Sequence, residues 1–168
     1  VRDILSGGAS SNPGNLTIVN GVLYFTASDG VNGTELWKSD GTSLGTTLVR
    51  DINPGSASSS PTSLTNVNGT LFFVADDGSH GIELWKSDGT STGTVLVVDI
   101  NLGASSSIPS NLTNVNGTLF FIADDGTHGA EVWKSNGTDS GTVLVRDINM
   151  PSSSSTPLYF ANVNGVMF

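Results

Sequence analysis

The sequence repeats every 48 residues, and this period restricts the fold more than any other feature. Three closely similar segments each begin 48 residues after the one before: ELWKSDGT at 35–42, ELWKSDGT at 83–90 and EVWKSNGT at 131–138. The 168 residues therefore hold 3.5 repeats without an insertion or deletion. A strict period of this size is typical of proteins built from repeated supersecondary units. We expect a single repeat array over 1–168, divided into a partial unit at 1–14, full units at 15–62, 63–110 and 111–158, and a partial unit at 159–168.

Each unit predicts four short strands separated by tight turns. In the second full unit, the segments with strand character are 64–67, 70–76, 82–87 and 94–100. Asn68-Gly69 separates the first two, and this dipeptide favours a two-residue hairpin turn. None of the segments shows the periodicity of a helix. The sequence therefore predicts an all-β chain.

Four antiparallel strands in one repeat match the size of a β-propeller blade. Residues 71–75 and 95–98 are apolar without interruption, which is typical of strands buried on both faces, as the middle strands of a blade are. We therefore predict β-propeller blades of four antiparallel strands. The alternative is a β-solenoid, in which one unit would form two coils. Since 3.5 blades do not close a ring, we expect a larger propeller or an oligomeric one.

Composition excludes several classes of protein. The chain has no cysteine, which excludes disulfides, thiolate metal sites and cysteine nucleophiles. Its net charge of -9 repels phosphate backbones, so we expect no nucleic-acid partner. No apolar segment approaches the roughly 18 residues of a membrane span, so we expect no membrane insertion.

The segments ELWKSDGTSLGT at 35–46 and ELWKSDGTSTGT at 83–94 resemble the ELWxxDGT-repeat family. The third copy, EVWKSNGTDSGT at 131–142, departs from the motif at Val132 and Asn136 but keeps its spacing. The resemblance covers essentially the whole chain. It implies a bacterial protein that is secreted or attached to the cell surface, with a propeller-like β structure. It implies no catalytic residues.

Acidic turns provide the candidate metal ligands. Asp76 and Asp77 precede a glycine, and Glu83 follows seven residues after Asp76. The equivalent residues of the next unit are Asp124, Asp125 and Glu131. Carboxylates in glycine-rich loops are ligands of Ca²⁺, so these six residues are candidate calcium ligands. Their spacing matches neither the EF-hand loop nor the RTX nonapeptide, and the alternative is that each aspartate caps its own turn. We therefore expect no cofactor other than calcium.

The recurring tryptophans have two interpretations. Trp37, Trp85 and Trp133 each follow an aliphatic residue on the predicted third strand, so the two side chains face opposite sides of the sheet. Packing between blades is the favoured interpretation. The alternative is a set of shallow carbohydrate sites in which the tryptophans stack on sugars.

Two further groups of residues are interpreted as surface loops. His80 and His128 occupy equivalent positions, where the first unit has Asn32. This substitution favours a solvated loop residue over a metal ligand. The serine-rich connectors at 56–60, 105–107 and 152–155 are interpreted as flexible, soluble loops.

The sequence indicates a binding or structural function. A catalytic carboxylate pair needs two different environments, whereas each acidic pair here recurs by repetition, so we expect no enzyme. We predict an extracellular or cell-surface repeat protein that acts as a scaffold, adhesin or filament component and associates with itself. The alternative is a carbohydrate-binding propeller module with several equivalent sites and glycans as partners.

Overall fold

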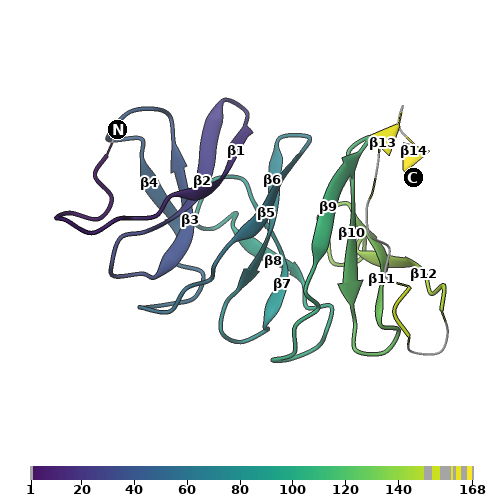
Figure 1. Ribbon diagram of the computed structural model, residues 1–168. Coiled ribbons are helices and arrows are strands. Elements are labelled where there is room, and N and C mark those ends of the chain that lie inside the picture. Colours follow the sequence, from purple (N-terminus) through teal and green to yellow (C-terminus); the bar gives the residue numbers. More distant parts are fainter. Residues whose placement is uncertain (1, 150–152, 156–159, 161, 164–165, 168) are drawn as a thin grey trace.

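The computed structural model describes residues 2–149, 153–155, 160, 162–163 and 166–167. The described chain is all-β and contains three separate antiparallel sheets of four strands each (Figure 1). None of these sheets closes into a barrel. Part of the third serine-rich connector and half of the partial unit at 159–168 lie outside the described residues.

Each sheet is formed by strands that are consecutive in the sequence. The first unit contains β1 (Gly14–Val19), β2 (Val22–Ser28), β3 (Thr34–Ser39) and β4 (Thr47–Arg50). The second contains β5 (Thr62–Val67), β6 (Thr70–Asp76), β7 (Ile82–Ser87) and β8 (Val95–Val98). The third contains β9 (Ser110–Val115), β10 (Thr118–Asp124), β11 (Ala130–Ser135) and β12 (Val143–Arg146). A short pair, β13 (Asn162–Val163) and β14 (Val166–Met167), follows.

The predicted strands agree closely with the observed ones. The second and third strands of the second unit have the predicted bounds, 70–76 and 82–87. The first strand begins earlier than predicted, at Thr62, because a β-bulge around Ser63 extends the pairing with β6. Ser63 has a φ of 54°, which is the left-handed conformation expected at such an irregularity. The fourth strand is shorter than predicted and ends at Val98.

The predicted hairpin turns are present between the first two strands of each unit. Asn68 has a φ of 50° and Gly69 a φ of 84°, so both central residues are left-handed, as a type I′ turn requires. Asn20-Gly21 and Asn116-Gly117 have the same conformation. These turns set the register in which Val67 pairs with Thr70.

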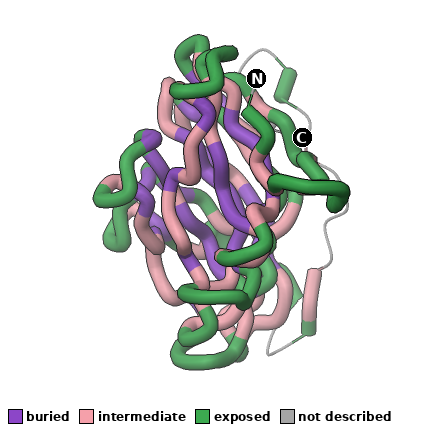
Figure 2. Tube along the Cα trace, turned by 90° about the vertical axis from the view of Figure 1, so that its left-hand side faces the viewer, coloured by how far each residue is buried: buried purple, intermediate pink, exposed green. Residues whose placement is uncertain are grey.

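The units pack face to face, and the cores lie between them. One cluster joins Tyr24 and Leu36 of the first unit to Phe73 and Trp85 of the second. An equivalent cluster joins Phe72 and Leu84 of the second unit to Phe121 and Trp133 of the third. Figure 2 shows the buried residues as a central band with exposed loops at both ends of the strands. The first strands of successive units also lie against one another, β1 against β5 and β5 against β9.

Candidate functional site

A buried glutamate on the third strand of each unit holds the connector to the next unit. Glu83 is fully buried, and its Oε1 accepts a hydrogen bond from the Ser107 amide at 2.7 Å. Its Oε2 accepts from the Ser107 hydroxyl and from the Ile100 amide. Glu35 makes the same three contacts with Ser59 and Ile52. Burial raises the pKa of Glu35 and Glu83, although these hydrogen bonds act in the opposite direction.

These contacts correct the interpretation of the serine-rich connectors. Ser59 and Ser107 are each only 1% exposed, so this part of the connector is not a solvated, flexible loop. Of the two serine contacts, the third connector shares only the amide contact: the Ser155 amide donates to Glu131 Oε1 at 2.8 Å, but the Ser155 hydroxyl has no hydrogen-bond partner among the described residues. A small hydroxyl side chain fits beside the buried carboxylate and supplies a donor to it. The first two connectors are therefore parts of the interior at Ser59 and Ser107.

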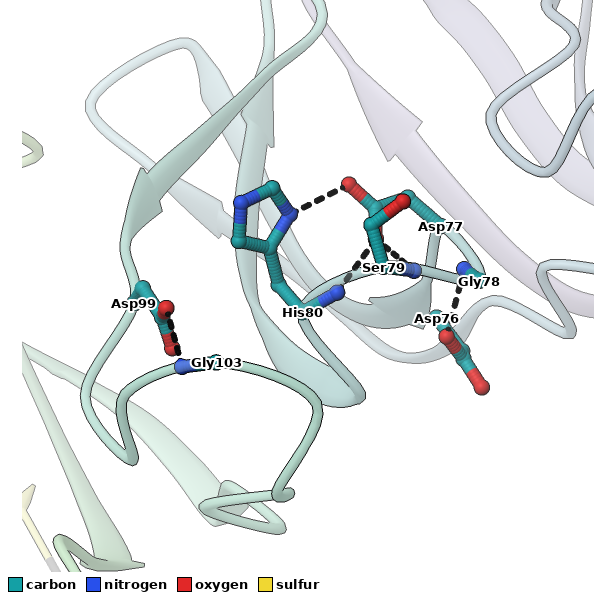
Figure 3. Close-up of polar contacts among 7 residues, drawn as sticks. All are labelled: Asp76, Asp77, Gly78, Ser79, His80, Asp99 and Gly103. Atoms are coloured by element: carbon teal, nitrogen blue, oxygen red, sulfur yellow. Dashed lines mark hydrogen bonds and ion pairs between the residues drawn. The ribbon is translucent and has the colours of Figure 1, made fainter.

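The aspartates of the acidic turns cap their own backbone. Asp76 Oδ1 accepts from the Gly78 amide at 2.7 Å, and Asp77 Oδ1 accepts from the amides of Ser79 and His80, each at 2.9 Å. Figure 3 shows the two carboxylates on opposite sides of the turn. Asp124 and Asp125 make the equivalent contacts. Each aspartate therefore accepts hydrogen bonds from the amides of its own turn, as the turn-capping interpretation predicts.

The candidate calcium ligands already accept hydrogen bonds from within the chain. Glu83 is occupied by Ser107 and Ile100, whereas Asp76 and Asp77 bind turn amides. Within the described part of the chain, no group of three or more His, Cys, Asp and Glu side chains is placed to hold a metal ion. Calcium binding at these turns stays a prediction, and it would require the capping hydrogen bonds to be exchanged for metal coordination.

Each histidine forms a pair with the aspartate of its own turn. His80 Nδ1 lies 2.8 Å from Asp77 Oδ2, and the His80 side chain is 43% exposed (Figure 3). The pKa of His80 is raised by this hydrogen bond and by the negative charges of Asp77, Asp99 and Glu83. Burial opposes ionisation of Asp77, but the hydrogen bonds from His80 and Ser79 outweigh it and lower the pKa of that carboxyl.

The first unit shows that asparagine fills the histidine position. Asn32 Nδ2 donates to Asp29 Oδ2 at 2.8 Å, and the Asn32 amide donates to Asp29 Oδ1 at 2.9 Å. Asn32 therefore makes the contacts that His80 makes with Asp77. The partly exposed histidines are loop residues that complete a turn, as the substitution at this position indicated.

A second aspartate lies near each histidine, at the end of the fourth strand. Asp99 Oδ2 accepts from the Gly103 amide at 2.8 Å (Figure 3). Its Oδ1 is buried and has no hydrogen-bond partner among the described residues, and Asp51 and Asp147 share this feature. Asp51 Oδ2 accepts from Gly55 in the same way. Asp51 and Asp99 thus fix the start of the connector that follows each of them.

Trp85 packs in the cluster between the first and second units, and Trp133 packs against the cluster between the second and third. Trp37 packs on the outer face of the first unit, with Phe25. Trp37 is 3% exposed and Trp85 is 4% exposed, and Trp133 is partly buried against the second unit. Leu84 and Trp85 belong to clusters on opposite faces of the same sheet, as strand alternation predicts. Buried rings cannot stack on a sugar, so the structure places Trp37 and Trp85 in the core.

Basic side chains reach from one unit to the next, and the sequence analysis did not identify them. Lys38 Nζ donates to the Gly89 carbonyl at 2.8 Å, and Lys86 Nζ donates to the Gly137 carbonyl at 2.6 Å. The Arg50 guanidinium donates to the Thr94 carbonyl at 2.6 Å and lies 5.9 Å from the Trp85 ring centroid. The constant 48-residue spacing of the lysines could have indicated a repeated contact.

Asparagine side chains link the first strands of successive units. Asn66 Nδ2 donates to the Ile18 carbonyl, Asn114 Nδ2 to the Asn66 carbonyl, and Asn162 Nδ2 to the Asn114 carbonyl. The donor and acceptor residues are 48 positions apart in each case. The contact is therefore a ladder that repeats with the period of the sequence.

Comparisons with known proteins do not assign the chain to a family. No family model and no curated protein matches it. The resemblance to ELWxxDGT repeats therefore stays a prediction. Among the residues that the structure describes, no helix is long and apolar enough to cross a bilayer.

Proposed function

We propose that this protein is a non-enzymatic, extracellular repeat scaffold whose function depends on contacts between near-identical units. The observation that carries the proposal is the repetition of one interface. The Lys38 contact with Gly89 recurs as Lys86 with Gly137, and the Glu35 contacts with its connector recur at Glu83. An assembly whose units form one such contact can add further units through the same contact.

The geometry favours propeller blades over solenoid coils. Each unit is a complete antiparallel meander, and no strand of one four-stranded sheet pairs with a strand of another in the described chain. Units meet through their faces, and their first strands lie against one another. Blades of a propeller meet in this way, with the first strands near the axis. The chain would then supply consecutive blades of a larger or oligomeric propeller.

The side chains that suggest chemistry are used to hold the structure. Glu83 binds a connector, Asp77 and His80 close a turn, and Trp85 fills the core between units. A scaffold needs these roles and no reactive group, which is the basis for proposing that the protein is not an enzyme. The net charge of -9 on a cysteine-free chain suits a protein that stays soluble outside the cell.

Sedimentation equilibrium of the wild-type chain over a wide concentration range tests the proposal. A scaffold of this kind forms particles of two or more chains as concentration rises. A single species of 17.3 kDa at every concentration would contradict it. Adding EDTA identifies any dependence on calcium, and a glycan-binding screen tests the carbohydrate-binding alternative on the same sample.

A further inference from the structure

The two complete interfaces inside the chain share one set of contacts. The first unit presents Tyr24 and Lys38 to Gly89 of the second, and a Cβ on Gly89 would clash with the Tyr24 hydroxyl oxygen. The second unit presents Phe72 and Lys86 to Gly137 of the third in the same way. One face of each unit therefore supplies an aromatic ring and a lysine, and the opposite face supplies a glycine with its carbonyl group.

The outer face of the third unit, called here the far face, carries the first half of this interface, and two of its apolar residues are more exposed than their equivalents in the other units. Val145 is 46% exposed, whereas the equivalent Val49 and Val97 are 5% and 6% exposed. Ile148 is 63% exposed, whereas the equivalent Ile100 is 8% exposed. Lys134, the equivalent of Lys38 and Lys86, is exposed to solvent.

The outer face of the first unit, called here the near face, carries the second half. It contains an open groove of about 470 Å³, lined by residues that include Ile18, Leu23, Phe25 and Gly41. Leu23 and Phe25 are equivalent to residues of the second unit that are fully buried against the first. Gly41 is exposed, whereas its equivalents Gly89 and Gly137 are buried. Leu16 also lines the groove, and Leu16 and Ile18 are 64% and 66% exposed.

We propose that the near face of the first unit binds the far face of the third unit of a second copy of this chain. Lys134 of one copy then donates to the Gly41 carbonyl of the other, as Lys38 does to Gly89 within the chain. The contact continues the established interface, and it joins two different surfaces, so copies associate head to tail. The inference rests on the proposed function and adds the partner and the direction of assembly.

Two short segments lie on these faces and are displaced in the proposed contact. Arg2 donates to the Thr46 carbonyl at 3.2 Å and lies 5.9 Å from the Trp37 ring centroid, as Arg50 does at Thr94 and Trp85. Arg146 of the second copy is the equivalent residue and takes the place of Arg2. On the far face, β13 lies against β9 and is held there by the Asn162 contact with Asn114.

Blocking the two faces separately tests the proposal. Leu16→Asp places a charge on the near face, where the equivalent Leu64 and Leu112 pack against the clusters between units. Val145→Asp places a charge on the far face. Leu16 and Val145 are 64% and 46% exposed, so the fold is retained. Leu102→Asp is the matched control, because Leu102 is 83% exposed on the connector of the second unit. Circular dichroism and thermal unfolding establish that each variant folds before its mass is measured by sedimentation.

The proposal predicts that each face variant alone is monomeric and that an equal mixture of the two forms dimers and nothing larger. The control variant associates like the wild type. Association of Val145→Asp with itself, or a mixture that stays monomeric while the wild type associates, would overturn the head-to-tail contact and leave the proposed function standing. A wild type that never associates would contradict both.

Arg2→Ala tests the register of the contact. Removing Arg2 frees the Thr46 carbonyl for Arg146 of the second copy, so the dissociation constant is expected to fall by about threefold to tenfold. An unchanged or higher dissociation constant would show that Arg146 does not occupy this place.

Discussion

Glu83 on β7 and Ser107 in the connector to the third unit are joined by two hydrogen bonds, from the serine amide and from its hydroxyl. Both residues are buried, and 24 positions of sequence separate them. Because the connector carries the chain into β9, this pair fixes the point at which the third unit begins. The repeat therefore includes the path between sheets as well as the sheets themselves.

Glu83→Gln is expected to destabilise the fold by about 1–3 kcal/mol, because the amide group turns a donor toward the buried amide of Ile100 or Ser107. Urea unfolding followed by tryptophan fluorescence measures the change. Ser107→Ala removes only the hydroxyl contact and serves as the milder comparison. Equal stability of Glu83→Gln and the wild type would show that the carboxylate does not hold the connector.

The histidine–aspartate pairs predict a pH dependence of stability. The pKa of His80 and of His128 is raised in the folded chain, so their contribution is complete below the ordinary value of 6.5 and is lost as pH rises through the folded pKa. Replacing both by asparagine, the residue of the first unit, removes this change. Thermal unfolding at a series of pH values compares the two proteins. A difference between them that does not vary with pH would contradict the pairing.

Arg50 contacts Thr94 and Trp85 between the first and second units. The equivalent residue at the next interface is Val98. Exchanging these two residue types tests what the arginine contributes. Arg50→Val removes the hydrogen bond to Thr94 and the ring contact with Trp85, and is expected to cost about 1 kcal/mol. Val98→Arg places the same side chain opposite Thr142 and Trp133 and is expected to stabilise by a similar amount. Denaturant midpoints of the two single variants measure both effects. A destabilising Val98→Arg would show that the second interface differs from the first.

Equivalent valines in different units should tolerate truncation differently. Val97→Ala removes two buried methyl groups between units and is expected to cost about 1.6 kcal/mol. Val145→Ala affects a side chain that is 46% exposed and should cost far less in a dilute, monomeric sample. Unfolding by urea at low protein concentration compares the pair. Equal costs would mean that the far face of the third unit is covered even in the monomer.

The strands were predictable because two local signals agree. The Asn-Gly turn fixes where β5 ends and β6 begins, and the apolar run at 71–75 identifies β6. The bulge at Ser63 was not predictable, because the left-handed conformation of a serine carries no signal of its own in the sequence. The packing of the sheets was predictable only in part. The apolar strands indicated that both faces of a sheet are buried, but not which residues of the next unit they contact.

The role of the glutamates was missed although the sequence contained a signal for it. Glu83 and Trp85 are two residues apart on one strand, so they lie on the same face of the sheet. If Trp85 is buried, Glu83 on the same face is buried as well. A buried carboxylate needs hydrogen-bond donors from the protein, so it is a poor candidate for a surface metal site. The donors are serines of the connector, whose composition suggested a loop in solvent. Only the three-dimensional path of the connector brings Ser107 to Glu83.

The most direct test of the scaffold account is the fluorescence of the tryptophans. Trp37 and Trp85 lie in the core and Trp133 is partly buried, so the account predicts a blue-shifted emission maximum and weak quenching by acrylamide. Added mono- and oligosaccharides should leave the emission unchanged. A red-shifted maximum with strong quenching, or an emission that shifts when sugars are added, would contradict the account and favour a carbohydrate-binding protein.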